Sequence, residues 1–170
     1  HTEFSRGILF DSPGGDVESA MSLGRAIRAA APVSVTVFQA ECHSACVLAI
    51  AGATTRHLRA GRIGIHRPYS VGLPGSSLAQ NTKNFKDLEV RIRTYLNEMN
   101  LPPSLLDEML RYEPQTMHVM TPDELSRFRL EGVDYIWRDQ VDSEAARRYG
   151  IDKATYLARR AQADRTCTHR

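Results

Sequence analysis

The chain has 170 residues, a length that suits one domain over 1–170 with a sizeable buried core. Its apolar content of 42%, charged content of 25% and net charge of +2 are ordinary for a globular protein and give no strong field for nucleic acid or an anionic membrane. No apolar run approaches the roughly 20 residues that span a bilayer. We therefore expect no nucleic-acid partner and no membrane span.

The first half of the chain alternates short apolar runs with helical patterns. Strands are expected at 8–10, 33–37 and 63–65. Apolar spacing predicts a helix from Asp16 to about Ile27, and the small apolar run 45–53 predicts a buried helix that begins at Ser44. This order predicts an α/β fold with parallel strands, right-handed crossovers and functional groups at the carboxyl ends of the strands.

The second half begins with a long polar segment. Residues 69–84 are rich in Gly, Ser, Pro and Asn and predict a loop beside the site. Apolar residues at helical spacing then predict a helical arm over about 84–111, broken at Leu101-Pro-Pro103.

The chain should end in further helices. Thr121-Pro-Asp-Glu124 combines an N-cap, a proline at the first helical position and a glutamate at the third, so a helix should begin there. A short strand at 133–136 and a C-terminal helix over about 142–163, with Gly150 as its weak point, complete the expected elements.

Two glycines follow Ser12-Pro13 at the end of the first expected strand. Glycine lets the backbone approach a ligand closely and turn its N–H groups outward, which suits a pocket for an oxyanion. A plain tight turn has the same composition, so both interpretations of Gly14 and Gly15 stay open.

A serine and a histidine lie at the ends of the next two strands. Ser44 could be a nucleophile or a helix N-cap, and the amide of Ala45 could complete an anion pocket. His66 could be a general base or a structural histidine. His43 is a rival base, but its side chain should point away from that of its neighbour Ser44.

Cys42 and Cys46 flank Ser44, and Cys167 lies near the C-terminus. Cys42 and Cys46 are candidates for a disulfide, which would indicate an oxidising compartment, or for two small buried thiols. No cysteine or histidine set has zinc spacing, so we expect no metal and no cofactor. No signal peptide is present, and the run His1-Thr-Glu-Phe4 is not typical of a natural start, so we expect that an upstream segment was removed.

Three segments in order resemble motifs of the Clp-type serine proteases, which share the crotonase superfamily architecture: Ser12-Pro-Gly-Gly15, His43-Ser44-Ala45 and Ile65-His66-Arg-Pro68. Met120-Thr-Pro-Asp-Glu-Leu125 through Gly132-Val-Asp134 is similar to that family's later helix start and its ending. The resemblance covers about residues 7–137 and implies a crotonase-like superhelix of ββα units. The Cys-x-Ser-Ala-Cys pattern is more similar to a secreted or periplasmic bacterial branch.

The resemblance implies Ser44 as nucleophile, His66 as general base, and the amides of Gly15 (or Gly14) and Ala45 as the oxyanion hole.

The resemblance also leads us to expect a catalytic aspartate a few residues before Thr121. This chain has Thr116-Met-His118 there, and Glu113 is the nearest carboxylate and the candidate third member. The lead before Ser12 is shorter than in the family, and a trimmed loop is expected at 54–59.

Three functions fit this pattern. The first is a serine-type, peptidase-like hydrolase that acts on a peptide or acyl substrate. The alternative is a catalytically inactive relative that serves binding or assembly, and the third is thioester chemistry of the crotonase type, against which the Ser/His order counts. The resemblance also implies a homo-oligomer, a trimer or hexamer-like ring, formed through the helical arm. Nothing resembles elements that dock an unfolding ATPase ring, so no ATPase partner is expected.

Overall fold

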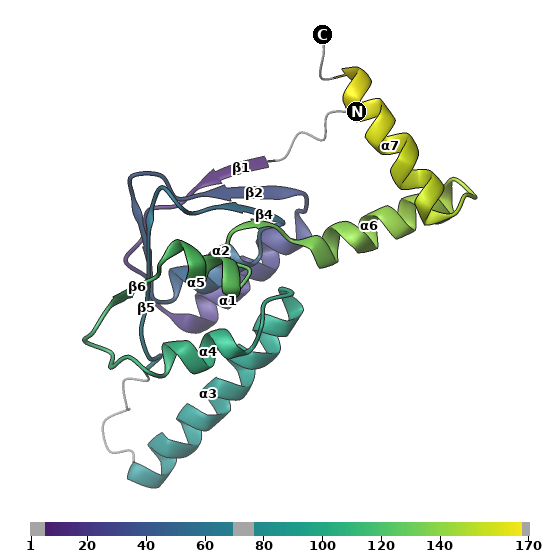
Figure 1. Ribbon diagram of the computed structural model, residues 1–170. Coiled ribbons are helices and arrows are strands. Elements are labelled where there is room, and N and C mark those ends of the chain that lie inside the picture. Colours follow the sequence, from purple (N-terminus) through teal and green to yellow (C-terminus); the bar gives the residue numbers. More distant parts are fainter. Residues whose placement is uncertain (1–5, 70–76, 168–170) are drawn as a thin grey trace. The chain divides into compact units, whose positions relative to one another are not determined.

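The computed structural model describes residues 6–69 and 77–167, and Figure 1 gives the arrangement of its elements. The chain divides into two compact units, His1–Val133 and Asp134–Arg170, and each is described by itself. All candidate site residues named above belong to the first unit. The organisation of 1–170 as a single domain stays a prediction.

The first unit contains a four-stranded sheet in the order β1-β2-β4-β7. Its strands are β1 (Arg6–Leu9), β2 (Val33–Thr36), β4 (Thr55–His57) and β7 (Gly132–Val133). Strands β1, β2 and β4 are parallel, and β7 pairs antiparallel with β4. Helix α1 (Val17–Ala29) connects β1 to β2, because parallel neighbours require a crossover.

A second sheet, in the order β3-β5-β6, positions the candidate site. Its strands are β3 (Glu41–His43), β5 (Arg62–Ile65) and β6 (His118–Val119). Strands β3 and β5 are parallel, and β6 is antiparallel to β5. The segment after β1 joins its edge through a bridge between Ser12 and Cys42. Three neighbouring segments therefore end on the same side, and they lead into Gly14–Gly15, Ser44 and His66.

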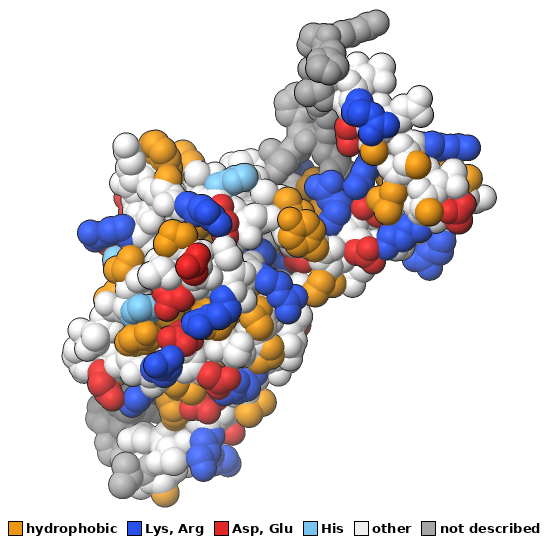
Figure 2. Space-filling model, viewed as in Figure 1, with side chains coloured by type: hydrophobic (Ala, Val, Ile, Leu, Met, Phe, Trp, Pro, Cys, Tyr) orange, Lys and Arg blue, Asp and Glu red, His pale blue; other side chains and the backbone are white. Residues whose placement is uncertain are grey.

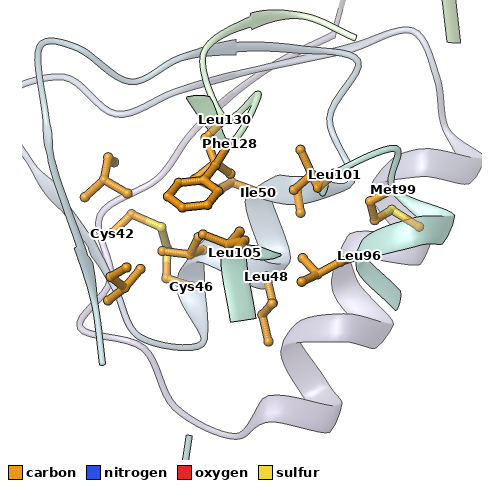
Figure 3. Packing of buried hydrophobic residues seen from close by; sticks show 14 of the residues in the cluster. Cys42, Cys46, Leu48, Ile50, Leu96, Met99, Leu101, Leu105, Phe128 and Leu130 are labelled. Atoms are coloured by element: carbon orange, nitrogen blue, oxygen red, sulfur yellow. A yellow bond between two sulfur atoms is a disulfide. The ribbon is translucent and has the colours of Figure 1, made fainter. Parts of the chain in front are cut away.

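Helix α2 (Cys46–Ala51) is buried on every side, as its small apolar sequence predicts. It packs closely on α1 because two glycines face each other. A Cβ added to Gly52 would lie 1.9 Å from the carbonyl oxygen of Gly24. Figure 3 shows Ile50 of α2 among apolar side chains of the core, with Leu48 at the lower edge of the view.

Three further helices complete the unit: α3 (Leu78–Glu98), α4 (Ser104–Met109) and α5 (Pro122–Arg127). In Figure 1, α4 lies beside α3, and the N-terminal turns of α3 extend away from the sheets. Tyr95 of α3 donates a hydrogen bond of 2.6 Å to the carbonyl of Leu48, and burial raises the pKa of its phenol far above the usual range. The predicted capping box of Thr121 and Glu124 at the start of α5 is confirmed.

The second unit is a pair of helices, α6 (Tyr135–Arg148) and α7 (Lys153–Cys167). The prediction of one helix over 142–163 is therefore wrong. The chain breaks at 149–152, where Gly150 adopts a φ of 64°, a left-handed conformation that favours glycine. An ion pair between the buried Asp142 and the partly exposed Arg160 joins the two helices.

The strand expected at 133–136 ends at Val133. Asp134 terminates it, because its side chain accepts a hydrogen bond of 3.0 Å from the amide of Trp137 and so caps α6.

The predicted α/β fold with parallel strands and C-terminal helices is confirmed, but other bounds differ. Helix α3 begins at Leu78 rather than near 84, because Ser77 accepts a hydrogen bond of 3.2 Å from the amide of Gln80. Of the loop expected at 69–84, residues 70–76 lie outside the described part. Strand β4 occupies part of 54–59, where a trimmed loop is expected. Strands β3, β4 and β6 have two or three residues each and are too short for an alternating pattern.

Over the face drawn in Figure 2, basic and acidic side chains are interspersed on the first unit. None of the described helices is both long and apolar enough to cross a membrane.

Candidate active site

Ser44 lies in the turn between β3 and α2 and has a φ of 56°. A serine rarely adopts this left-handed conformation, so the surrounding contacts must hold it. Its amide donates a hydrogen bond of 2.8 Å to the carbonyl of Gly64 in β5. The helix cap is Ala45, and no side chain caps α2. The alternative role of Ser44 as a helix N-cap is therefore wrong, and its hydroxyl is available for other chemistry.

A disulfide encloses the Ser44 turn. Cys42 in β3 and Cys46 at the start of α2 are bonded, with their Cα atoms 5.3 Å apart, and both are buried. Figure 3 shows this bond within the apolar core. It fixes the end of β3 to the beginning of α2, so the turn that carries Ser44 is closed by a covalent bond.

Gly14 and Gly15 differ in their contacts. A Cβ added to Gly14, whose φ is 104°, would lie 2.6 Å from the carbonyl oxygen of His43 and 2.8 Å from the Cβ of Ser44, so only glycine fits. The amide of Gly14 donates to the hydroxyl of Ser12 at 3.2 Å. Within the described residues, the amides of Gly15 and Ala45 have no hydrogen-bond partner. Of the two glycines, Gly15 therefore has the amide that can meet a ligand.

His66 follows β5 and is buried, with 7% of its surface exposed. Its Nδ1 lies 2.9 Å from the carbonyl oxygen of Arg67. A carbonyl oxygen only accepts hydrogen bonds, so Nδ1 must carry the proton of the neutral ring. The lone pair then belongs to Nε2, which is the nitrogen that a general base uses in this arrangement.

Ser44 and His66 line the same pocket of about 570 Å³. Its other walls come from the start of α1, from α3, and from Pro68 and Tyr69. An ion pair of 2.7 Å between Glu18 and Arg91 joins α1 to α3 at this pocket. Among the described contacts, no hydrogen bond joins Ser44 to His66. Such bonds are often long without substrate and tighten when substrate binds.

The candidate third member, Glu113, contacts a different residue. Its carboxylate lies 3.2 Å from Nη2 of Arg67, and within the described part of the chain no carboxylate pairs with His66. The β5–β6 register ends at Ile65 and His118, and the side chain of the next residue, Met117, packs at Gly64 beside the ring of His43. The segment 116–118, where the resemblance leads us to expect an aspartate, holds no carboxylate.

The rival histidine is packed elsewhere. His43 covers Gly64, where an added Cβ would lie 2.6 Å from the ring Cδ2 and 2.6 Å from Sδ of Met117. Its Nδ1 is 3.7 Å from a carboxylate oxygen of Glu41. The residues that line the Ser44 pocket include His66 and not His43.

Sequence reasoning gave Arg67 no role, although its carbonyl is the partner of His66. The only available signal was its place between His66 and Pro68 in the motif. Among the described residues, no three His, Cys, Asp or Glu side chains gather as a metal site requires.

Comparison with known proteins identifies the family. The model of the Clp protease family matches residues 7–104, more than half of the chain. This protein therefore belongs to the Clp protease family. The matched region includes Gly14, Gly15, Ser44 and His66.

One solved structure supports the fold, and a second is reported beside it. A mutant of ClpP1 from Listeria monocytogenes is 17% identical, with a TM-score of 0.53 over 72% of this chain and 68% of that chain. A mutant of the membrane-bound stomatin-specific protease 1510-N is 21% identical, with a TM-score of 0.49, and the match covers 72% of this chain and 61% of that protease. No curated protein matches this chain. At these identities the ClpP1 likeness supports the fold alone.

Proposed function

We propose that this protein is a serine-type, peptidase-like hydrolase that acts on a peptide or acyl substrate. Ser44 Oγ attacks the substrate carbonyl while Nε2 of His66 takes its proton. The amides of Gly15 and Ala45 donate to the negative oxygen of the tetrahedral intermediate. His66 then protonates the leaving group, and water hydrolyses the acyl-enzyme with His66 again acting as base.

The observation that carries this proposal is the state of the His66 ring. The hydrogen bond of 2.9 Å from Nδ1 to the carbonyl of Arg67 leaves the Nε2 lone pair available, and His66 shares a pocket with Ser44. A ring whose two nitrogens both had fixed partners would have no lone pair free to take a proton. Within the described residues, His66 has one such bond.

The backbone around Ser44 supports the same proposal. The unpartnered amides of Gly15 and Ala45 flank the serine, and the close contact of Gly14 with the Ser44 turn brings the two amides together. Preorganised backbone donors of this kind are worth roughly 10²–10³ in turnover each.

A fluorophosphonate probe tests the proposal directly. We expect covalent labelling of Ser44, located by mass spectrometry of the digested protein. Ser44→Ala should abolish labelling and His66→Ala should slow it strongly, whereas Ser22→Ala, an exposed serine on α1, should leave it unchanged. Labelling that persists in folded Ser44→Ala protein would contradict the assignment.

A second candidate function is a binding or assembly role without catalysis. The partner of His66 favours it, because among the described residues Nδ1 meets a main-chain carbonyl and no carboxylate that would stabilise an imidazolium. Under this alternative, correctly folded protein would not react with the probe at any concentration that labels an active serine hydrolase.

We also propose that the protein is a homo-oligomer and that it works in an oxidising compartment, secreted or periplasmic. The exposed N-terminal turns of α3 support the first point, and the Cys42–Cys46 disulfide supports the second. Light scattering that gives a monomer at micromolar concentration would contradict oligomerisation. Alkylation of both thiols in protein isolated without reductant would contradict the oxidised state.

A further inference from the structure

We propose that Arg67 is the positioning residue of the general base: its main-chain carbonyl replaces the missing carboxylate, and its side chain holds that carbonyl in place. This inference rests on the proposed function, because it takes His66 as the base. Its starting point is the hydrogen bond of 2.9 Å between Nδ1 of His66 and the carbonyl of Arg67.

A carbonyl can orient an imidazole only as firmly as its own peptide is held. The carbonyl of Arg67 belongs to the peptide that enters Pro68, which is buried and whose ring fixes φ. A residue before proline is itself restricted to extended conformations. The amide of Arg67 donates a hydrogen bond of 2.8 Å to the carbonyl of Tyr112. Both sides of the residue are therefore constrained.

The guanidinium of Arg67 provides the second anchor. Its Nε and Nη2 lie 3.2 Å and 3.0 Å from the carbonyl oxygen of Leu110, the residue that caps the C-terminus of α4. A cation is favoured at that end of a helix, because the last carbonyls are otherwise without partners. The side chain thus fixes the segment after β5 to α4 at one point.

Glu113 contacts the guanidinium of Arg67 from the solvent side. It pairs with Arg67 at 3.2 Å, but 64% of its side chain is exposed, so the ion pair adds little stability by itself. Its contribution is to hold the guanidinium in the plane that faces Leu110. The carboxylate expected to act on the histidine directly therefore acts on it through Arg67.

The first test measures turnover of an activated ester or peptide, or the rate of probe labelling, in Arg67→Ala. We expect kcat to fall tenfold or more with little change in KM, because the pocket is unchanged and the base is misaligned. Arg67→Lys keeps the charge opposite Glu113 but loses the paired donors to Leu110, so it should fall between Arg67→Ala and the wild type.

Arg93 offers a matched control. Its side chain is 37% exposed, as is that of Arg67, and it likewise pairs with a carboxylate, Asp107, and donates to a main-chain carbonyl, that of Pro103. Arg93 does not line the pocket. Arg93→Ala should lower the melting temperature about as much as Arg67→Ala and leave kcat unchanged. Equal losses of kcat in the two variants would overturn the proposal.

A spectroscopic test does not require activity. The ¹⁵N shifts of His66 report which ring nitrogen is protonated. We expect the Nδ1–H form in the wild type and in Arg93→Ala, and a mixture of tautomers in Arg67→Ala and, to a lesser degree, in Arg67→Lys. An unchanged Nδ1–H form in Arg67→Ala would overturn the positioning role even if the enzyme is active. If Arg67→Ala loses the Nδ1–H form but even the wild type never reacts with the probe, the positioning role of Arg67 stands and the hydrolase proposal is contradicted.

Discussion

The two halves of the candidate site are held by different forces. The nucleophile side is fixed by a covalent bond and by close packing: the Cys42–Cys46 disulfide closes the Ser44 turn, and Gly14 lies against it. The base side is held by hydrogen bonds, several of them partly exposed, around His66 and Arg67. We therefore expect the nucleophile side to tolerate changes of pH and polarity and to be disrupted by steric changes, and the base side to be disrupted by single polar substitutions.

The largest effect should come from the steric side. Gly14→Ala places a Cβ 2.6 Å from backbone at a φ of 104°, so we expect a loss on the order of 2–4 kcal/mol of unfolding free energy and no probe labelling. Denaturant melts measure the loss. Gly7→Ala is the control, because a Cβ there meets nothing within 4 Å. Similar losses for both glycines would remove the steric half of the comparison.

The next effect tests the covalent bond. Replacing Cys42 and Cys46 together by Ala should cost about 2 kcal/mol, near the low end for a disulfide, because the closed loop is short, with a sequence separation of 4. Probe labelling should slow as the Ser44 turn loosens. Reductant should slow the wild type and leave the double variant unaffected, and a response of the variant to reductant would point to a different target.

A smaller change, of opposite sign, should come from the base side. Met117→Asp supplies a carboxylate in the segment 116–118, where the resemblance leads us to expect an aspartate, and we expect kcat to rise about tenfold, a fraction of the roughly 10⁴ that such a carboxylate is worth in a complete triad. Met117→Asn is the control for size and polarity. An equal response of the two variants would show that charge at this position does not reach the imidazole.

The smallest effect concerns pH. Burial alone would raise the pKa of Glu124, but hydrogen bonds from the amide and hydroxyl of Thr121 and from His118 outweigh it and hold the pKa below 4.5. A lowered pKa stabilises the fold above the unfolded value of about 4.5, and this contribution is lost as pH falls through the folded value.

His118 pairs with Ile65, the residue before the candidate base His66, and contacts Glu124, so we expect this side of the candidate site to weaken first in acid. Glu124→Gln should reduce the acid dependence of unfolding free energy and cost about 1 kcal/mol at neutral pH, since it weakens the capping box. Glu89→Gln, at a partly exposed position of α3, is the control. An identical acid profile in Glu124→Gln would contradict the assignment.

Much of the fold could be read from the sequence, because long periodic segments and turn residues carry local signals. The strand before Gly14, the buried helix after Ser44 and the capped helix at Thr121 are of this kind. The short strands β3, β4 and β6 are not, because their pairing depends on segments distant in the chain.

In the candidate site, too, only the residues that belong to local motifs could be predicted from the sequence. The motifs name Ser44, His66 and the glycines, but a main-chain carbonyl such as that of Arg67 leaves no mark on the choice of side chains. The sequence does not distinguish Gly14 from Gly15. Only the three-dimensional contacts show that Gly14 packs against the Ser44 turn and that Gly15 has the unpartnered amide among the described residues. The packing of Met117 at Gly64 likewise depends on how β6 pairs with β5.

The buried hydrogen bond from Tyr95 to Leu48 has a mechanical consequence. Helix α3 lines the pocket at Leu88 and Arg91, and through Tyr95 it is also attached to α2, the helix that begins directly after the Ser44 turn. A shift of α3 along its axis must therefore either drag α2 with it or leave a phenol and a carbonyl unsatisfied in the core. Displacement of α3 is therefore transmitted through Tyr95 to α2 and so to the turn that carries Ser44.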